Sequence, residues 1–312
     1  MALKRSPKII RSILPALALA VLLVAIYVLN PRAISPLGFQ LMFNLAIPIA
    51  LATIAQMCVM TINDLDLSIG AYVGFVVCVA ATWLNEVPLV GALMLAGSIV
   101  VYCLIGALIY LRNLPSIVVT LGMSFVWLGL AILILPTPGG KSPDWIASIM
   151  KLKTPVVPFP VIAAVVIATI SHLALMRTSY GAILRGSGGN PRAVERAGWS
   201  LLKTKITMFG LAGVFGTLSG LALIGLTTSA QANVAERYTL LSIAGVVLGG
   251  GDFLGGRVSP IGAVLGALTL TLTAPFLTFL RISPDWQIGA QGGILIVVLA
   301  LRVIIERMVR SK

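Results

Sequence analysis

Long apolar runs alternate with short polar connections along the chain, a pattern typical of helices that cross a membrane. Most runs approach the ~20 residues that a helix needs to span a bilayer. Ten such segments are predicted: 13–29, 39–62, 69–84, 88–111, 115–135, 156–175, 206–226, 239–251, 260–280 and 287–301. The eighth is too short, because its 13 residues reach only about 20 Å as a helix. Either its polar flanking residues lengthen the helix enough to span the membrane, or it enters the membrane as a half-helix. The glycines at its end favour a break.

The composition supports this interpretation. Of the 312 residues, 59% are hydrophobic and 10% are charged, whereas a soluble domain carries about 25% charged residues. The mean hydropathy of +1.07 excludes a soluble enzyme. The sequence therefore predicts an all-α, polytopic membrane protein in which residues 1–312 form a single transmembrane domain.

The formal net charge of +13 comes from 22 Lys and Arg against 9 Asp and Glu. We interpret it as a topology signal and not as a nucleic-acid-binding surface, because cytoplasmic loops of membrane proteins are rich in Lys and Arg. Lys4, Arg5, Lys8 and Arg11 precede the first apolar run, which predicts a retained first span and a cytoplasmic N-terminus. Ten crossings from that start place 16 of the 22 basic residues inside and 6 outside. They also return the C-terminus to the cytoplasm.

The connection 177–205, on the predicted cytoplasmic side, contains residues that begin and end a short helix. Asn190 is a good N-cap, Pro191 suits the first helical position, and Gly198 suits the C-terminal stop. The sequence therefore predicts a two-turn helix over 191–197. Its charged side chains are Arg192, Glu195 and Arg196. Because such a helix is too short to be stable alone in water, it is either a kinked solvated turn or a rigid element that a cytoplasmic protein grips.

Two carboxylates, Asp64 and Asp66, stand at the junction of the second and third segments, directly before Ser68 and Gly70. Acid–base or metal chemistry is one interpretation, but no His and no further acid lies nearby in the sequence. Because the junction falls at the predicted cytoplasmic interface, we expect Asp66 or Ser68 to cap the following helix. No metal site is predicted, since the three cysteines match no metal spacing.

Glycines cluster between the eighth and ninth segments. They are Gly249, Gly250, Gly255 and Gly256, followed by Gly262 and Gly266. The last two have the small-xxx-small spacing that lets membrane helices approach closely, and the double glycines suit a tight cytoplasmic turn. No Gly-Lys-Ser/Thr follows, so we do not expect this chain to bind a nucleotide itself.

Asn44, Gln56 and Thr61 are polar groups in the otherwise apolar second segment. Each would cost about 1–3 kcal/mol if buried without a partner, so they either line a solute pathway or pair with a neighbouring helix. No Asp, Glu, Lys or Arg lies near the centre of any predicted span. Since such residues are typical of ion-coupled carriers, we expect the energy for transport to come from another chain.

Four motifs stand out between residues 40 and 300. They are Asp64-Leu65-Asp66-Leu67-Ser68-Ile69-Gly70; Thr120-Leu121-Gly122-Met123; Gly189-Asn190-x-x-Ala193-x-x-x-Gly198; and Leu248-Gly249-Gly250-x4-Gly255-Gly256-x5-Gly262-x3-Gly266-Ala267-Leu268. Together they resemble the signatures of ribose/xylose-type permeases, the membrane subunits of bacterial ABC sugar importers, within the branched-chain/sugar permease superfamily. The first is similar to that family's Gly-Gly-Ile-Asp-Leu-Ser-Val-Gly, the third to its coupling loop and the last to its C-terminal signature. Asn63 and Asp64 replace the paired glycines, and Gln56 and Leu128 also depart from the pattern, which leaves the solute open.

The resemblance implies a transport subunit and not an enzyme, with no catalytic residue, metal or cofactor of its own and with ATP-Mg bound by a partner chain. The helix 191–197 would be the coupling helix, seated in a groove on a cytoplasmic ABC ATPase. Its coupling residues would be Gly189, Asn190, Pro191, Arg192, Glu195, Arg196 and Gly198. The structural motif residues would be Asp64, Asp66, Ser68, Gly70, Gly249, Gly250, Gly255 and Gly256. A second permease, identical or paralogous, and an external solute-binding protein would complete the importer in the bacterial cytoplasmic (inner) membrane.

Three alternatives stay open at this point. An ABC permease for amino acids or nucleosides has related sequence patterns and differs in its solute. An ion-coupled secondary carrier is disfavoured by the span centres, which lack charged residues. A passive channel or structural membrane subunit would not require a capped cytoplasmic helix.

Overall fold

The structure, a computed structural model, describes residues 7–152, 154, 157–227, 229–252, 255–283 and short stretches between 285 and 300. The described residues form helices, with a single isolated β-bridge between Gly139 and Ala230. The helices are α1 (Pro7–Leu29), α2 (Pro36–Phe43), α3 (Ala46–Thr61), α4 (Ile69–Ala81), α5 (Trp83–Glu86), α6 (Pro88–Leu111), α7 (Ser116–Ile134), α8 (Asp144–Met150), α9 (Phe159–His172), α10 (Ser179–Gly189), α11 (Pro191–Arg196), α12 (Leu201–Leu226), α13 (Tyr238–Leu248) and α14 (Pro260–Phe279). A 3₁₀ turn η1 (Pro31–Ile34) and a π-helical turn η2 (Leu173–Arg177) complete them. The predicted all-α class is confirmed.

The first nine predicted segments each coincide with a helix or a pair of helices. Within the described residues, six helical stretches are long and apolar enough to cross a membrane, and α2 with α3, bent by 44° at their junction, makes a seventh candidate. The apolar part of α1, Leu14–Leu29, and α13 are shorter. The tenth predicted segment, 287–301, lies largely outside the described residues, so the count of ten spans and the side of each terminus stay predictions.

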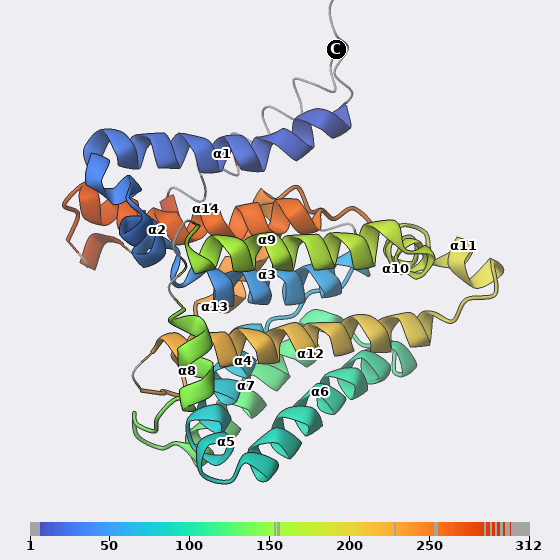
Figure 1. Cartoon of the computed structure of the whole chain (residues 1–312). Helices are drawn as coiled ribbons and strands as arrows, with labels where there is room; N and C mark the ends of the chain where they lie inside the picture. The colour runs from blue at the N-terminus through green and yellow to red at the C-terminus, as the bar shows by residue number, and fades with distance from the viewer. Residues whose placement is uncertain are drawn as a thin grey trace, which may run out of the picture.

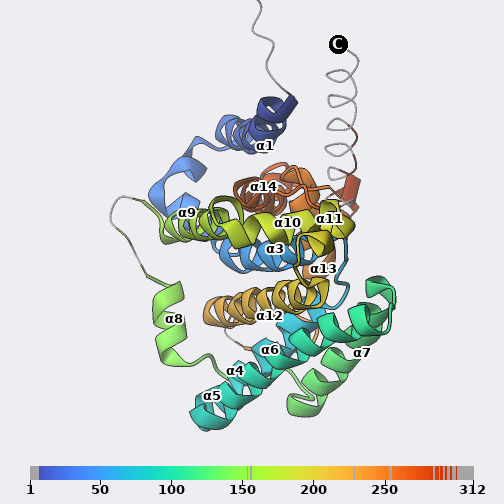
Figure 2. The same cartoon turned by 90° about the vertical axis from the view of Figure 1, so that its right-hand side faces the viewer.

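Helix α3 lies at the centre of the molecule, and all of its residues are buried. It packs against α9, α12, α13 and α14, while α12 also packs against α4 and α6. Figures 1 and 2 show α1 on one side of this centre, next to α14, and α6 and α7 on the opposite side. Figure 1 also shows α10 and α11 at one end of the bundle and α8 at the other.

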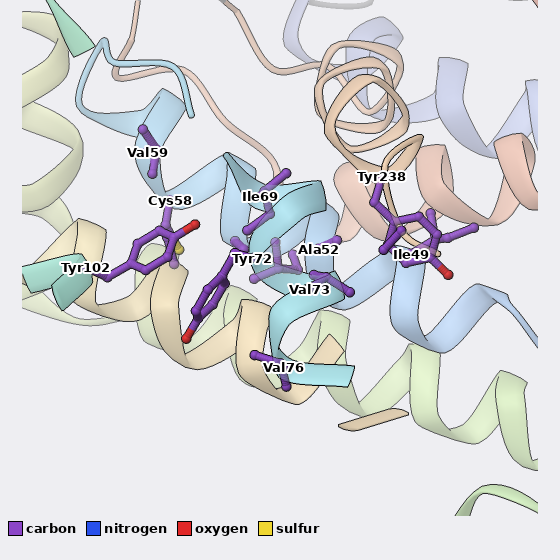
Figure 3. Close-up of a cluster of buried hydrophobic side chains, with 14 of the residues drawn as sticks. Ile49, Ala52, Cys58, Val59, Ile69, Tyr72, Val73, Val76, Tyr102 and Tyr238 are labelled. Carbon is purple, nitrogen blue, oxygen red and sulfur yellow. The ribbon is translucent and has the colours of Figure 1, made fainter. Parts of the chain in front are cut away.

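The core joins apolar side chains from α3, α4, α6, α12 and α13, some of which Figure 3 shows. Several polar groups within it pair with one another, which offsets the cost of removing them from water. The hydroxyl of Tyr72 lies 2.9 Å from Ser98 Oγ and 2.7 Å from Thr217 Oγ1, so it links α4 to α6 and α12. By contrast, α1, α6, α7 and α9 expose many large apolar side chains on their outer faces, as expected of surfaces that face lipid.

The close approach of α13 and α14 depends on the predicted glycine spacing. A Cβ on Gly262 would lie 1.9 Å from the Gly249 carbonyl oxygen, and one on Gly266 would lie 2.2 Å from the Gly245 carbonyl oxygen. No side chain fits in either place. The small-xxx-small interpretation is therefore confirmed, and its partner is the short helix α13.

Candidate functional site

The predicted cytoplasmic helix is present as α11, which ends one residue earlier than expected. Asn190 Oδ1 accepts the backbone N–H of Ala193 at 3.1 Å, and Pro191 occupies the first turn. At the other end, Gly198 has a φ of +83°, and its N–H donates to the Glu195 carbonyl at 2.9 Å. Both ends are thus fixed by the residues that the sequence indicates.

A second helix, α10, lies in the same connection and was not predicted. Its N-cap is Thr178, whose Oγ1 accepts the backbone N–H of Gly181 at 2.9 Å. Helix α9 continues through η2 as far as Arg177, and the extended backbone of Thr178 separates it from α10, so the connection 177–205 contains two short helices. Only Val194 of α11 is buried, and a Cβ on Gly186 of α10 would lie 3.2 Å from its Cγ2.

The charged residues of α11 take no part in this attachment. Arg192, Glu195 and Arg196 are exposed, and no ion pair joins them to another described residue. Figure 1 shows α11 at the extreme end of the molecule, beyond the bundle. The helix therefore has a buried apolar anchor and a free charged face.

The end of α10 fits against the end of α3. A Cβ on Gly188 would lie 1.9 Å from the Thr61 carbonyl oxygen and 2.7 Å from the Gly256 nitrogen. The N–H of Gly256 in turn donates to the Thr61 carbonyl at 2.8 Å. Gly255 and Gly256 have φ values of +71° and +70°, which a residue with a Cβ adopts only with strain. The structure thus brings the predicted C-terminal glycine motif together with α3 and α10.

An ion pair fastens the same region to α12. Lys205 Nζ lies 2.6 Å from Asp64 Oδ2, and the two side chains are 22% and 9% exposed. Lys205 stands in the first turns of α12, shortly after α11, and Asp64 follows α3. The coupling-end cluster, named after the coupling helix that the sequence predicts, consists of Thr61, Asp64, Gly188, Lys205 and Gly256.

Of the two residues predicted to cap α4, Ser68 holds the N-cap position, and Asp66 lies two residues before it in a buried turn. Asp66 is fully buried; its Oδ1 accepts the N–H and the hydroxyl of Ser68, each at 2.7 Å, and its Oδ2 accepts the hydroxyl of Tyr102 at 2.9 Å. Ser68 occupies the N-cap position without a capping hydrogen bond. Tyr102 stands nine residues before the end of α6, which is about 14 Å along the helix. Segment 62–68 therefore returns into the protein before α4 begins.

Several groups hold the side chain and the backbone of Asp66. The amide of Gln56 pairs with the Asp66 backbone: Nε2 donates to the carbonyl at 2.9 Å, and Oε1 accepts the N–H at 3.3 Å. These contacts fix the turn that starts α4.

Helix α13 also begins inside the protein. Near the start of segment 229–237, Ala230 pairs with Gly139. The segment then follows α4 toward the first turn of that helix. A Cβ on Gly74 would lie 2.2 Å from the Ala232 carbonyl oxygen, and one on Gly70 would lie 2.6 Å from the Ala235 carbonyl oxygen. Thr239 Oγ1 accepts the N–H of Gly70 at 3.0 Å. The first turns of α4 and α13 therefore meet, and the entry of α13 into the membrane as a half-helix stays a prediction.

The predicted pathway residues are not brought together. Asn44 is half-buried at the bend between α2 and α3, where it lines a cavity of about 290 Å³ with Gln40 and Lys151. Gln56 and Thr61 are fully buried, and the Thr61 hydroxyl donates to the Met57 carbonyl at 2.7 Å. Partners within the protein thus satisfy both, and a role in the pathway stays a prediction.

Over residues 39–299 the chain matches the family described as branched-chain amino acid transport system / permease component. The chain belongs to this family. The family match and the apolar helices make it a multi-pass membrane protein, as predicted for the bacterial cytoplasmic membrane.

Curated relatives of this permease carry the names of importer subunits. It is 26% identical to the ribose import permease protein RbsC of Bacillus subtilis, covering 92% of this chain and 91% of the relative. It is 28% identical to the autoinducer 2 import system permease protein LsrC of Yersinia pseudotuberculosis (95% and 87% covered). It is 26% identical to the galactose/methyl galactoside import permease protein MglC of Haemophilus influenzae (76% and 77% covered). The resemblance to sugar importer permeases is confirmed, and no solved structure matches the chain.

Sequence reasoning missed the polar residues of segment 229–237, which it left in an outer connection without a function. The signal was present: α13 is too short to span, and Gln231, Asn233 and Glu236 stand directly before it. A short apolar helix preceded by polar residues is typical of a discontinuous span in transporters. Within the described residues, no group of three or more His, Cys, Asp or Glu side chains is placed to hold a metal.

Proposed function

We propose that this permease is the membrane subunit of a bacterial ABC importer for a sugar or a sugar-like solute. A separate cytoplasmic ATPase, with ATP-Mg bound, supplies the energy, a second permease subunit pairs with this one, and an external binding protein delivers the solute. The names of the relatives support the solute class, since they include ribose and galactose import permeases. The observation that carries the proposal is α11, a capped helix with a free charged face at the end of the bundle.

The coupling-end cluster supports a mechanical path from α11 into the membrane. When the ATPase halves close, they tilt α11, and α10 moves with it because Val194 is buried at their contact. The backbone of Gly188 has no space beside Thr61, so a displaced α10 presses on the end of α3. Because the Lys205–Asp64 ion pair connects the end of α3 to α12, the start of α12 moves together with α3. Access to the pathway then changes between the two sides of the membrane.

An amino-acid solute is the second candidate, and the family description favours it. Both candidates use the same coupling scheme and differ only in what the importer carries. Uptake of radiolabelled D-ribose, D-galactose and L-leucine by cells that express the whole importer separates them. Saturable uptake of either sugar, and none of L-leucine, is the expected result.

The test of coupling uses Glu195→Arg and Gly198→Val in the complex purified with its ATPase. Removing one partner of a buried charge pair at an interface costs roughly 2–5 kcal/mol, which weakens docking by about tenfold or more. We expect less ATPase to co-purify, or its hydrolysis to lose dependence on the solute, while the permease still inserts in the membrane. Glu86→Arg, the same substitution at an exposed site on α5, is the control. Full uptake with normal ATPase recovery in both variants would contradict the proposal.

The proposed orientation has its own test. Cysteine at Lys141, in the connection between α7 and α8, is expected to react with a membrane-impermeant thiol reagent in intact cells. Cysteine at Arg192 in α11 is expected to react only after permeabilisation, because the charge asymmetry places that side in the cytoplasm. Labelling of Arg192→Cys in intact cells would reverse the orientation and remove the ATPase from α11.

A further inference from the structure

A cavity lies where the first turns of α4 and α13 meet, beside α7. Its volume is about 680 Å³, within the range of small-molecule sites. Helix α7 forms an apolar wall with Leu121, Phe125, Leu128 and Ile132. The opposite side is polar, with Gln231, Asn233, Glu236 and Thr239, and Ser124 adds a hydroxyl from α7.

The polar side of this cavity lies beside the first turns of α4, which belong to a candidate membrane span. Segment 229–237 follows α4 from Gly74 to Gly70, and Gly70 stands just after the turn that holds Asp66 beside Tyr102. The side chains of Asn233 and Glu236 are nevertheless exposed. A carboxylate that faced lipid at this depth would be costly, so the cavity must hold water or a polar molecule.

The charges around the cavity restrict what it accepts. No Lys or Arg is among the described residues that line it, and Glu236 is its single charged group. The first turn of α4 offers little compensating positive charge, because Asp66 already accepts the Ser68 N–H and Thr239 already accepts the Gly70 N–H. A phosphate or a carboxylate on the solute would therefore meet a negative site without a cation. An uncharged solute meets no such penalty.

The hydrogen-bonding groups match hydroxyls. The amides of Gln231 and Asn233 both donate and accept, the hydroxyls of Ser124 and Thr239 do the same, and the Glu236 carboxylate accepts two or more hydrogen bonds. Carboxylate acceptors make the stronger bonds. Across the cavity, the ring of Phe125 is 69% exposed and offers a flat apolar surface to the C–H face of a ring.

We propose that this cavity is the solute site of the permease and that it takes an uncharged, polyhydroxylated ring of pentose or hexose size. Glu236 and Asn233 bind the hydroxyls, and Phe125 packs against the apolar face of the ring. The inference deepens the proposed function and rests on it. It moves the site from the three polar residues of α2–α3 to the meeting point of α4, α7 and α13.

The first test measures solute preference in cells that express the whole importer. The variants Glu236→Gln, Asn233→Ala and Phe125→Leu are compared with Glu86→Gln and Asn85→Ala, which change the same residue types at exposed sites outside the cavity. We expect the ratio of D-ribose to D-galactose uptake to change by roughly tenfold in Glu236→Gln, the value of one charged hydrogen bond. Recovery of the ATPase should be unchanged, since α11 is intact.

The outcomes separate this inference from the proposed function. If the native importer takes up a sugar but all three cavity variants keep the ratio and rate of their controls, the site is wrong and the proposed function stands. If the native importer takes up L-leucine and neither sugar, a sugar is the wrong solute both for the proposed function and for this site.

A second test asks whether the cavity holds water. Asn233→Cys and the control Asn85→Cys are made with Cys103 replaced by Ser; the other two cysteines are buried. An impermeant methanethiosulfonate reagent is expected to label both in intact cells, and the transported sugar to slow the labelling of Asn233→Cys alone. Labelling of the control but not of Asn233→Cys, both with and without ATP bound by the ATPase, would overturn the inference.

Discussion

Helix α11 and the meeting point of α4 and α13 differ in how their structure is determined. The ends of α11 depend on Asn190, Pro191 and Gly198, which act on neighbours within a few residues. The start of α4 depends on Asp66 and Tyr102 and on a segment more than 150 residues away, since Thr239 binds Gly70. One element is specified locally, and the other exists only when distant segments fold together.

This difference fits the roles proposed for the two regions, a coupling helix at α11 and a solute site at the junction. An element with locally fixed ends keeps its shape while it moves against a partner, as a coupling helix must. A junction built from distant segments changes when those segments shift, as a gate for solute must. The comparison therefore predicts that substitutions at the junction affect the stability of the whole protein, whereas substitutions at α11 act locally.

The largest expected effect is at the contact between α4 and segment 229–237. Gly74→Val places side-chain atoms where the Ala232 carbonyl lies, 2.2 Å from the ideal Cβ position. Because backbone and not a flexible side chain stands in the way, we expect a cost of about 3 kcal/mol or more, at the upper end for overpacking. The measurement is the yield of monodisperse permease in detergent, which should fall severalfold.

The matched control is Gly122→Val on α7, where no atom lies within 4 Å of the Cβ position. Its yield should remain near that of the native chain. Equal yields for the two variants would mean that segment 229–237 does not pack on α4, and the half-helix junction would then be wrong.

The second prediction tests whether Asp66 organises the junction. Asp66→Ala leaves the Ser68 N–H and the Tyr102 hydroxyl without their buried acceptor, at about 1–3 kcal/mol each. Asp66→Asn retains an oxygen for Ser68 and should cost less. We expect the midpoint of thermal unfolding in detergent to fall in the order native, Asp66→Asn, Asp66→Ala.

Tyr102→Phe supplies the control for this order. Combined with Asp66→Ala, it removes the donor that the first substitution leaves unpaired, so the double variant should be more stable than the sum of the single effects implies. Strict additivity would show that Asp66 and Tyr102 act independently, and the buried turn would lose its central contact.

The sequence predicts α11, the apolar helices and the close packing at Gly262 and Gly266, because each depends on residues near one another in the chain. It does not identify the buried contacts of Asp66, since they include Tyr102 in another helix. It names Gly255 and Gly256 as a motif but does not identify Thr61 and Gly188 as their contacts. Segment 229–237 was missed for the same reason: its polar residues are typical of a loop until its contact with α4 is known.

The smallest expected effect is at the N-cap of α11. Asn190→Ala removes the acceptor for the Ala193 N–H, at about 1 kcal/mol for a cap, whereas Asn190→Gly should cost only a few tenths. Since a single buried side chain attaches α11 to α10, we expect this loss to fray α11 and leave the thermal midpoint of the permease unchanged. Amide hydrogen exchange should quicken severalfold in 191–198 and nowhere else, and recovery of the ATPase should decrease with it.

Thr178→Ala, which removes the equivalent cap of α10, should instead quicken exchange in 179–189, because α10 lies between α11 and the coupling-end cluster. If Asn190→Ala lowered the thermal midpoint as much as Asp66→Ala does, α11 would be as dependent on distant contacts as the junction is, and the contrast between the two regions would fail.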